Sequence, residues 1–595
     1  MAGILGIAAS SHSAEIFPKM LCFAKLFPWY ETSVFGNFAA CGLKDLGTCV
    51  TRANRTLIFY GEIFSAPGST SAEAANYLLE GLEANGRSFL TRVDGRFQAA
   101  LWDEGTQKLT LFCDQFATRP LYWTQTEDSF LFAPQIKTLL QHSGVKRSLD
   151  PEALVDFFTW GQYFHSRTSV SGIELLPPGG FFTWDAVSKK LTKERYFVFR
   201  GRDSETTLTE TVEAIRHSIL QQTQETFSDG KGDPETLGIS LSGGLDARSI
   251  LGMIPRELQK RMTSVALGVP GSADHHLAAQ LAQKAGTRHF NYELNTDFLF
   301  HYDDFLTEMV RLTDGQYLSS SIVIPTLKFY REQNIRTLLR GHAGELFHMG
   351  KAYAFSMTNA ERSAMSDGIL SPKDWAFAHL QAFMLDGVNS DLLRGMPRIQ
   401  CAELAKKSLN RALEETGEER ENAIWKLYLS QRVFREIPLS MRKFDSHVNI
   451  RLPFLNRGLI ENVFQLPSSQ RMGETIQKAL LERWRPDFLE VKNVNTGTFI
   501  GAGRIRQKAA GLRHRILAKL NVPGYQPYEK MGLWLRRELK PLVSQLLLKD
   551  GLRDRSIFDP DTITEVVHSH NAGKNHTYLI LALLILEKQI RFLEI

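Results

Sequence analysis

The sequence predicts a two-domain protein in which a strand-rich α+β domain precedes an α/β domain built on a parallel sheet. The chain has 595 residues, more than one hydrophobic core usually holds. Its N-terminal third contains short, bulky runs typical of strands, whereas from Leu208 onward short apolar strands alternate with helix-length segments. Strands separated in this way indicate crossover helices and a parallel sheet. We place the boundary in the polar stretch Gly201–Glu205, which gives domains of residues 1–205 and 206–595.

Three runs in the first domain predict strands, because they are bulky and apolar and are bounded by Gly, Asp or Pro. They are Leu57–Tyr60, Phe97–Trp102 and Leu109–Phe112. Between the first two runs, Ala72–Glu83 is rich in Ala, Leu and Glu. These residues have high helix propensity, so we expect one helix there.

Short apolar strands are expected in the second domain at Leu237–Leu241, Thr263–Leu267 and Thr337–Leu339. The segment Arg504–Lys519 carries basic residues with apolar residues between them, at the spacing of an amphipathic helix. We interpret the basic side chains as a solvated helix face, with a partner or phosphate site as the alternative. The apolar stretch Tyr578–Leu586 is expected to form a buried C-terminal helix.

Composition excludes several classes of protein. The chain is 43% hydrophobic and 23% charged, as in an ordinary globular protein, and its formal charge of +5 is too small for a typical nucleic-acid binder. The five cysteines form no CxxC pair, which argues against structural zinc and for reduced thiols. The N-terminus lacks the features of a signal peptide, and no stretch has the roughly 20 apolar residues of a membrane span. We expect a cytoplasmic protein.

The segment Gly238–Arg248, with the sequence GISLSGGLDAR, is the most informative in the chain. An apolar strand ends at Leu241, small residues form the turn, and a helix can begin near Asp246. Backbone N–H groups at such a turn approach an anion closely, and the helix N-terminus favours negative charge. The Asp246 carboxylate can hold Mg²⁺ that bridges phosphates. The pattern is not the Walker GxxxxGKS/T. A plain turn with glycines chosen for geometry is the alternative, but the full string after a strand favours phosphate binding.

The SGGLD string at Ser242–Asp246 resembles the pyrophosphate loop of N-type ATP pyrophosphatases, and the surrounding chain resembles asparagine synthetase. Four later segments are similar to family motifs in the expected order: Ala273–Ala282 with Gly286–His289 (the SDE and LGT segment), Leu339–Phe347 (the GDGGDELF loop, one residue shorter), Arg451–Asn456 (RxPFLD), and Lys478, near the family's catalytic lysine. The resemblance covers nearly the whole chain. It implies that the second domain is an ATP pyrophosphatase domain of the PP-loop class.

The front of the chain is similar to the glutaminase domain of the same family. The matching segments are Gly61–Phe64 (NGEIYN), Asp94–Phe97 with Leu101–Asp103 (DGMFAFALWD), Asp114–Tyr122 (DRFGIKPLYY) and Phe132–Lys137 (FASEIK). The resemblance implies the four-layer sandwich of N-terminal-nucleophile (Ntn) hydrolases for residues 1–205.

Three departures indicate that this glutaminase site is degenerate. Active members carry a cysteine nucleophile after Met1, but this chain has Ala2, which has no nucleophilic atom. The asparagine expected before Gly61, an oxyanion-hole donor in the family, is Tyr60. No counterpart of the family's RLAI arginine stands between Phe35 and Val50. We therefore expect the domain to persist as a scaffold around Ala2, Tyr60, Gly61 and Glu62. A nucleophile replaced in the laboratory is the alternative reading of Ala2.

The resemblance also implies the chemistry: a carboxylate attacks the α-phosphorus of ATP, and an amine then displaces AMP from the acyl adenylate. It assigns Asp246 and Glu345 to Mg²⁺ and Lys478 to charge developing at phosphorus or acyl oxygen, although Lys478 can also be an ordinary surface lysine. The ATP and pyrophosphate residues that it implies are Ser240, Leu241, Ser242, Gly243, Gly244, Asp246 and Gly341.

Two further departures bear on the reaction. Ala247 replaces a usual serine, which removes one phosphate hydrogen bond. His342 stands where asparagine synthetases carry an acidic residue, β-lactam-forming relatives carry tyrosine, and lasso-peptide cyclases can carry histidine. A histidine with an unperturbed pKa near roughly 6.5 can deprotonate an attacking ammonium. The alternative is a histidine that only hydrogen-bonds within its loop.

These features predict an ATP-dependent amide ligase that does not use glutamine, such as a macrolactam or β-lactam-type cyclase. Its substrate would be a carboxylate-bearing small molecule or a peptide, with a precursor peptide and a leader peptidase as candidate partners. One alternative is an asparagine synthetase that uses ammonia or glutamine, and another is a non-catalytic nucleotide-binding relative. A tRNA-modifying enzyme is more distant, since the usual cysteine pairs and RNA-binding extensions are absent.

Overall fold

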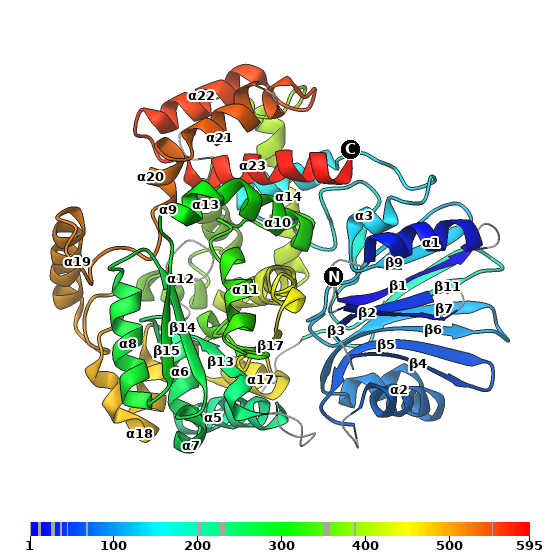
Figure 1. Ribbon diagram of the computed structural model, residues 1–595, viewed down its shortest axis with the longest axis horizontal. Helices are drawn as coiled ribbons and strands as arrows, with labels where there is room; N and C mark the ends of the chain where they lie inside the picture. The colour runs from blue at the N-terminus through cyan, green and yellow to red at the C-terminus, as the bar shows by residue number, and fades with distance from the viewer. Residues whose placement is uncertain are drawn as a thin grey trace.

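The computed structural model describes residues 2–9, 13–24, 30–35, 38–43, 46–66, 70–199, 205–226, 233–348, 357–385, 388, 390–549 and 551–595. A strand-rich body lies beside a larger, mainly helical body (Figure 1). Most of the boundary stretch expected from the sequence, residues 201–204, lies outside the described residues.

The N-terminal body contains two six-stranded sheets in which all neighbouring strands are antiparallel. The first has the order β10-β8-β9-β1-β3-β2, with β10 Glu174–Leu175, β8 Tyr122–Gln125, β9 Ser129–Ala133, β1 Gly3–Ala9, β3 Phe38–Leu43 and β2 Tyr30–Phe35. The second has the order β12-β11-β7-β6-β5-β4, with β12 Lys190–Arg195, β11 Gly180–Asp185, β7 Lys108–Cys113, β6 Gly95–Asp103, β5 Arg55–Ile63 and β4 Gly47–Arg52.

Side-chain alternation along the strands generates four layers. In β1, Ile4 belongs to the core between the sheets, whereas Leu5 faces the cluster under helices α1 (Ser13–Ala24) and α3 (Ile136–Leu139). In β5, Ile58 faces the inter-sheet core and Phe59 packs under α2 (Ser71–Asn85). Helices therefore cover both outer faces of a two-sheet sandwich, as the resemblance implied. The predicted strands and helix of this domain are confirmed as β5, β6, β7 and α2.

The second body is built on a five-stranded, fully parallel sheet of order β15-β14-β13-β16-β17. The strands are β13 Leu237–Ser240, β14 Thr263–Gly268, β15 Arg288–Glu293, β16 Thr337–Leu339 and β17 Asn449–Arg451. The three strands expected from the sequence are confirmed as β13, β14 and β16. The chain runs outward from β13 to β15 and then returns to the other side of β13. Ligands of open α/β sheets bind at such a reversal, beyond the carboxyl ends of the strands.

Helices surround this sheet. They are α4 Pro151–Trp160, α5 Leu208–Glu225, α6 Leu245–Met253, α7 Arg256–Gln259, α8 Ala273–Ala285, α9 Thr296–Phe300, α10 Tyr302–Thr313, α11 Ile324–Glu332, α12 Asn359–Ser366, α13 Pro372–Met384, α14 Arg398–Glu414, α15 Glu421–Leu427, α16 Ile437–Met441, α17 Arg457–Gln465, α18 Thr475–Trp484, α19 Arg504–Lys519, α20 Met531–Arg536, α21 Lys540–Ser544, α22 Pro560–Asn571 and α23 Thr577–Leu593, with a π-helical turn at Tyr428–Glu436. The predicted helices at residues 504–519 and 578–586 are confirmed as α19 and α23.

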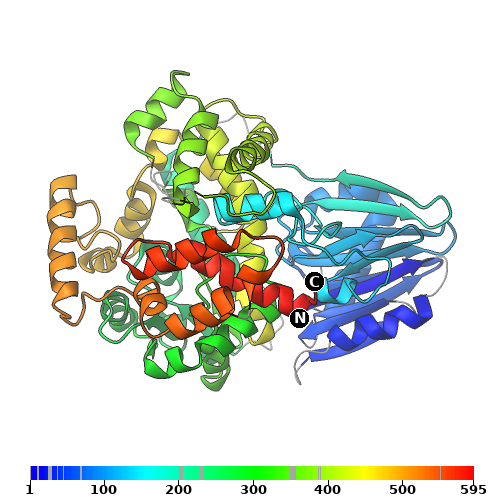
Figure 2. The ribbon, with the colours of Figure 1, turned by 90° about the horizontal axis from the view of Figure 1, so that it is seen from above.

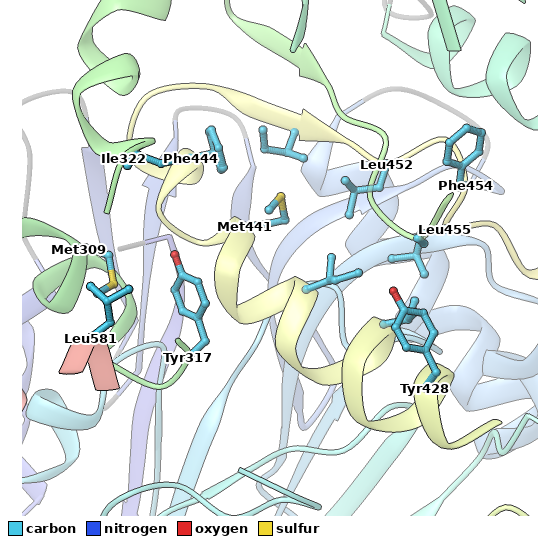
Figure 3. Close-up of a cluster of buried hydrophobic side chains, with 14 of the residues drawn as sticks. Met309, Tyr317, Ile322, Tyr428, Met441, Phe444, Leu452, Phe454, Leu455 and Leu581 are labelled. Carbon is cyan, nitrogen blue, oxygen red and sulfur yellow. The ribbon is translucent and has the colours of Figure 1, made fainter. Parts of the chain in front are cut away.

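The core of the second body reaches into the sequence range assigned to the first. Phe157, Phe158 and Trp160 of α4 belong to the same buried cluster as β13 and α23. Tyr317 and Met441 belong to this cluster (Figure 3) and also line the cavity described below. None of the described helices is both long and apolar enough to cross a membrane.

Charged side chains join the two bodies. Glu62 of β5 accepts two hydrogen bonds of 2.6 Å from the Arg451 guanidinium at the end of β17. Arg119 lies 3.7 Å from Glu62 and 3.7 Å from Asp445, which precedes β17. Arg96 also donates to the carbonyl of Ile450. The edge strand of the parallel sheet is thus held against the N-terminal sandwich by an ion-pair network.

Candidate functional site

The predicted phosphate loop lies between the end of β13 and the start of α6, at the reversal of strand order. Gly244 is the N-cap of α6, and its N–H lies 3.3 Å from Ser242 Oγ. The N–H of Gly243 donates to Asp274 Oδ1 of α8 at 3.1 Å. A Cβ on Gly243 would lie 2.9 Å from the side chains of Leu277 and Val494. Glycine is therefore required at this position by close packing.

A buried arginine that the sequence analysis did not single out supports this loop. Arg248 is fully buried in α6 and donates to the carbonyl of Gly243 at 3.0 Å. It also donates to the carbonyls of Val491 and Lys492, each at 2.6 Å. Burial lowers the pKa of Arg248 to about 10. Arg248 thereby fastens the phosphate loop to residues 490–502, a segment that we call the strap.

The loop that follows β16 packs directly against Asp246. A Cβ on Gly341 would lie 2.7 Å from Asp246 Cβ, and one on Gly344 would lie 2.3 Å from Asp246 Oδ1. Between these glycines, Ala343 has a left-handed backbone conformation with φ of 71°. The two glycine-containing loops, separated by about ninety residues in the sequence, therefore meet at Asp246.

The structure brings Gln477 rather than Lys478 to that carboxylate. Gln477 Nε2 donates to Asp246 Oδ1 at 2.6 Å, and the Gln477 side chain is only 1% exposed. His348 Nε2 lies 3.7 Å from the same oxygen. Lys478, by contrast, is 43% exposed, pairs with Glu482 at 3.3 Å and does not line the cavity. Adjacent helical residues point about 100° apart, so a one-residue difference in register decides which side chain faces the site.

A cavity of about 790 Å³ opens beside the phosphate loop. It is lined by the loop itself, by α4, α16 and α23, and by the residues after β14 and β16. The assigned residues Ser240, Leu241, Ser242, Gly244 and Asp246 lie on this lining, whereas Gly243 and Gly341 stand behind it.

Cationic side chains lie on the floor of the cavity. Arg340 and Lys443 line it, and Lys443 Nζ donates to the hydroxyl of Tyr317 at 2.8 Å. Arg340 stacks on Phe444 with 4.5 Å between its guanidinium carbon and the ring centre. Burial and, to a smaller extent, the positive charge of Arg340 lower the pKa of Lys443 well below its usual value. Burial also lowers the pKa of Arg340. The lining also carries the carboxylates of Glu436 and Glu529, so the cavity has mixed charge, and Arg340 and Lys443 are the side chains on it that could contact an anionic ligand.

His342 lines the same cavity, but its pKa is not the unperturbed value expected from the sequence. Burial, then the positive charges of Arg340, Lys443 and Arg432, lower the pKa of His342 well below 6.5. The expectation was wrong because the sequence could not reveal which cations surround this loop. This shift favours the neutral form of the imidazole, in which one ring nitrogen carries a lone pair that can accept a proton.

Glu345 lies in the 3-10 turn Gly344–Phe347, behind the cavity lining. Its Oε2 atom is buried and has no hydrogen-bond partner among the described residues. Burial lowers the pKa of Arg432, but the carboxylate of Glu436 and, more weakly, that of Glu345 raise it. Within the described ranges, no group of three or more His, Cys, Asp or Glu side chains surrounds a metal position. The Glu345 oxygen is nevertheless of the chemical type that Mg²⁺ prefers, an ion that usually completes its shell with phosphate oxygens and water.

The degenerate glutaminase residues are packed into the sandwich. Tyr60 is fully buried, and its ring lies against Gly42. A Cβ added at Gly42 would be only 2.3 Å from a ring carbon of Tyr60. The Arg119 guanidinium lies 4.9 Å from the centre of this ring. Ala2 packs against the same cluster of side chains. Burial raises the pKa of Glu62, but Arg451 and Arg119 outweigh this effect and lower it to about 2, so Glu62 is committed to ion pairs.

Comparisons with known proteins agree with the two-domain description. The asparagine synthase family model matches residues 233–490, which include both glycine loops and α18, and the glutamine amidotransferase domain model matches residues 67–197, beyond Ala2 and Tyr60. Asparagine synthetase [glutamine-hydrolyzing] 2 of Bacillus subtilis is 19% identical over 74% of this chain and 60% of its own length. Asparagine synthetase [glutamine-hydrolyzing] of Homo sapiens is 23% identical over 39% of this chain and 42% of its own. The chain thus spans less than two thirds of the length of these relatives.

Proposed function

Because the chain belongs to the asparagine synthase superfamily, we propose that it is an ATP-dependent amide ligase that activates a carboxylate as its acyl adenylate and does not hydrolyse glutamine. The observation that carries this proposal is the meeting of two glycine-containing loops at Asp246, beside a cavity lined by Arg340 and Lys443. This arrangement supplies backbone donors for phosphates and side-chain charge for a carboxylate in one enclosed space.

The phosphate loop would bind the pyrophosphate portion of ATP through backbone N–H groups at the N-terminus of α6, with Ser242 as a hydroxyl donor. Asp246 and Glu345 would hold Mg²⁺, which neutralises charge on the departing pyrophosphate. Arg340 and Lys443 would orient the substrate carboxylate, because an anion between them offsets their mutual repulsion. Fixing the reactants in line and away from water is the main contribution that such a site makes to rate.

The amine must be deprotonated before it can attack the acyl adenylate. We assign this step to His342, whose neutral imidazole lines the cavity and can accept the proton. Burial and the nearby cations make the protonated form of His342 costly, so the proton should pass onward to solvent or to the departing AMP.

Loss of glutaminase activity is supported by Ala2, which has no nucleophile, and by the burial of Tyr60 in the sandwich core. An amine source within the substrate would remove the need for ammonia, as in macrolactam or β-lactam closure. The cavity of about 790 Å³ would have to hold ATP together with the substrate, since most of the residues assigned to ATP lie on its lining.

Magnesium-ATP binding and ATP–pyrophosphate exchange test the proposal. We expect calorimetry to detect binding that Asp246→Asn weakens at least about tenfold, since the variant loses a charge facing Mg²⁺. Exchange dependent on a candidate carboxylate would identify an enzyme, whereas binding without exchange for any tested carboxylate or peptide would favour the non-catalytic alternative. Absence of nucleotide binding would refute the proposal. Ala2→Cys should show no glutamine hydrolysis, and robust glutaminase activity in that variant would show that Tyr60 does not block the site.

A further inference from the structure

A second hollow of about 770 Å³ lies between α8, the strap and α19, and we call it the α8–α19 groove. Its lining includes His276 and Leu277 of α8, Phe499 of the strap, and Arg506 and Arg513 of α19. None of the described side chains of α19 is buried, and the helix stands at the edge of the molecule farthest from the strand-rich body (Figures 1 and 2). The helix therefore contributes a wall to the groove and little to the core.

The groove lies next to the candidate active-site cavity. Val494 of the strap lines both hollows, and the start of α8 separates them, with Asp274 on the cavity side and Leu277 on the groove side. Gly243 of the phosphate loop packs against both Leu277 and Val494. The Val494 side chain would therefore separate a ligand in the groove from the site where phosphates are expected.

The charge of the groove is strongly one-sided. Lys492, Arg506 and Arg513 line it, and in the described part of the chain none of the three forms an ion pair. The acidic side chain on the lining, Glu490, already pairs with Lys284 at 2.6 Å. Unpaired cations that converge on one concave surface attract acidic ligands.

The groove also presents apolar and aromatic surface between these cations. Phe499 is 52% exposed, an unusual state for a phenylalanine in a folded protein, and Tyr525 closes the other side, with Arg513 5.9 Å above its ring. Apolar pockets with a few charges placed between them suit an extended peptide that carries both side-chain types.

We propose that the α8–α19 groove binds an acidic segment with interspersed apolar side chains in a peptide substrate, whose reacting carboxylate extends past Val494 into the cavity. This inference rests on the proposed function, since it names the substrate class of that site. Cavity and groove are each large enough for a drug-sized ligand, so a small amino acid would leave the groove without a role.

The test measures fluorescence anisotropy of a labelled peptide of repeated Glu-Leu-Gly, without nucleotide, against the full-length protein. Arg506→Glu combined with Arg513→Glu should weaken binding at least about tenfold, because two attractive charges become repulsive. Lys508→Glu combined with Arg515→Glu is the matched control: it makes the same change in net charge on the same helix, at exposed positions outside the groove lining. This control should weaken binding no more than about twofold.

Three results would overturn the proposal: no peptide binding, equal binding of a Lys-Leu-Gly peptide, or equal loss in both double variants. Magnesium-ATP binding, measured on the same proteins, separates this inference from the proposed function. The groove variants should retain nucleotide binding, and Asp246→Asn should retain peptide binding. Peptide binding without any nucleotide binding would refute the ligase proposal alone, whereas nucleotide binding without peptide binding would refute the groove assignment alone.

Discussion

Gln477 and Lys478 are adjacent in α18, but only the Gln477 side chain reaches Asp246. The sequence resemblance assigns the catalytic role to Lys478, since a lysine is expected near that point. The hydrogen bond of 2.6 Å from Gln477 and the outward ion pair of Lys478 favour the other residue. A neutral amide can orient a carboxylate, but it cannot contribute the positive charge that a lysine would bring to the phosphates. The floor residues Arg340 and Lys443 are the cations that the structure offers instead.

Alanine substitution distinguishes the two neighbours. Gln477→Ala should weaken magnesium-ATP binding about tenfold, because a buried hydrogen bond to a charged group contributes about 1.5–3 kcal/mol to holding the Asp246 carboxylate in place. Lys478→Ala should change it by less than about twofold, as expected for an exposed ion pair. Calorimetry and ATP–pyrophosphate exchange would measure both. A larger loss in Lys478→Ala would restore the assignment made from the sequence.

The loop after β16 works as a unit because its backbone must approach Asp246 closely. It is one residue shorter than the family motif that it resembles, and its two glycines contact the carboxylate that α6 presents. Any side chain at Gly344 would occupy the volume of the Asp246 carboxylate. Glycine is therefore required at position 344 because there is no space for a side chain, and not because of the backbone conformation, which lies outside the left-handed region.

Gly344→Ala should displace Asp246 and weaken magnesium-ATP binding at least about tenfold, while secondary structure measured by circular dichroism stays unchanged. Gly511→Ala in α19 is the control. A Cβ there meets nothing within 4 Å, and alanine should stabilise a helix interior by about 0.5–1 kcal/mol. Wild-type nucleotide binding by Gly344→Ala would mean that the two loops do not form one site.

The whole molecule depends on the contact between its two bodies, and Glu62, which we propose to belong to a degenerate glutaminase site, helps to make this contact. Glu62, part of the motif that resembles the family's NGEIYN, pairs with Arg451 of the parallel sheet and is 21% exposed. A domain that has lost its nucleophile can be retained for such a structural reason. The α4 helix also links the two bodies, because it lies within residues 1–205 but belongs to the core of the second body.

Glu62→Gln should lower the free energy of unfolding by about 3 kcal/mol at neutral pH, since it leaves the buried Arg451 without its paired carboxylate and leaves Arg119 with Asp445 alone. Glu80→Gln, which removes an exposed partner of Arg52, should leave the urea midpoint essentially unchanged. The pKa of Glu62 is lowered from 4.5 to about 2, so its stabilisation is present above pH 4.5 and is lost as the pH falls toward 2. The difference between wild type and Glu62→Gln should shrink over that interval, and a constant difference would contradict the ion-pair account.

The sequence by itself determined the strands β5, β6, β7, β13, β14 and β16, the glycine-containing turn at Ser242–Asp246 between β13 and α6, and the absence of a nucleophilic atom at Ala2. Each of these features depends on contiguous residues, because local propensity or a single missing atom decides the outcome. Tertiary structure alone decided that Gln477 faces Asp246, that burial and nearby cations lower the pKa of His342, and that Glu62 joins the two bodies. These properties depend on distances and burial among residues far apart in the chain, and a change of one position in helical register is enough to reverse them.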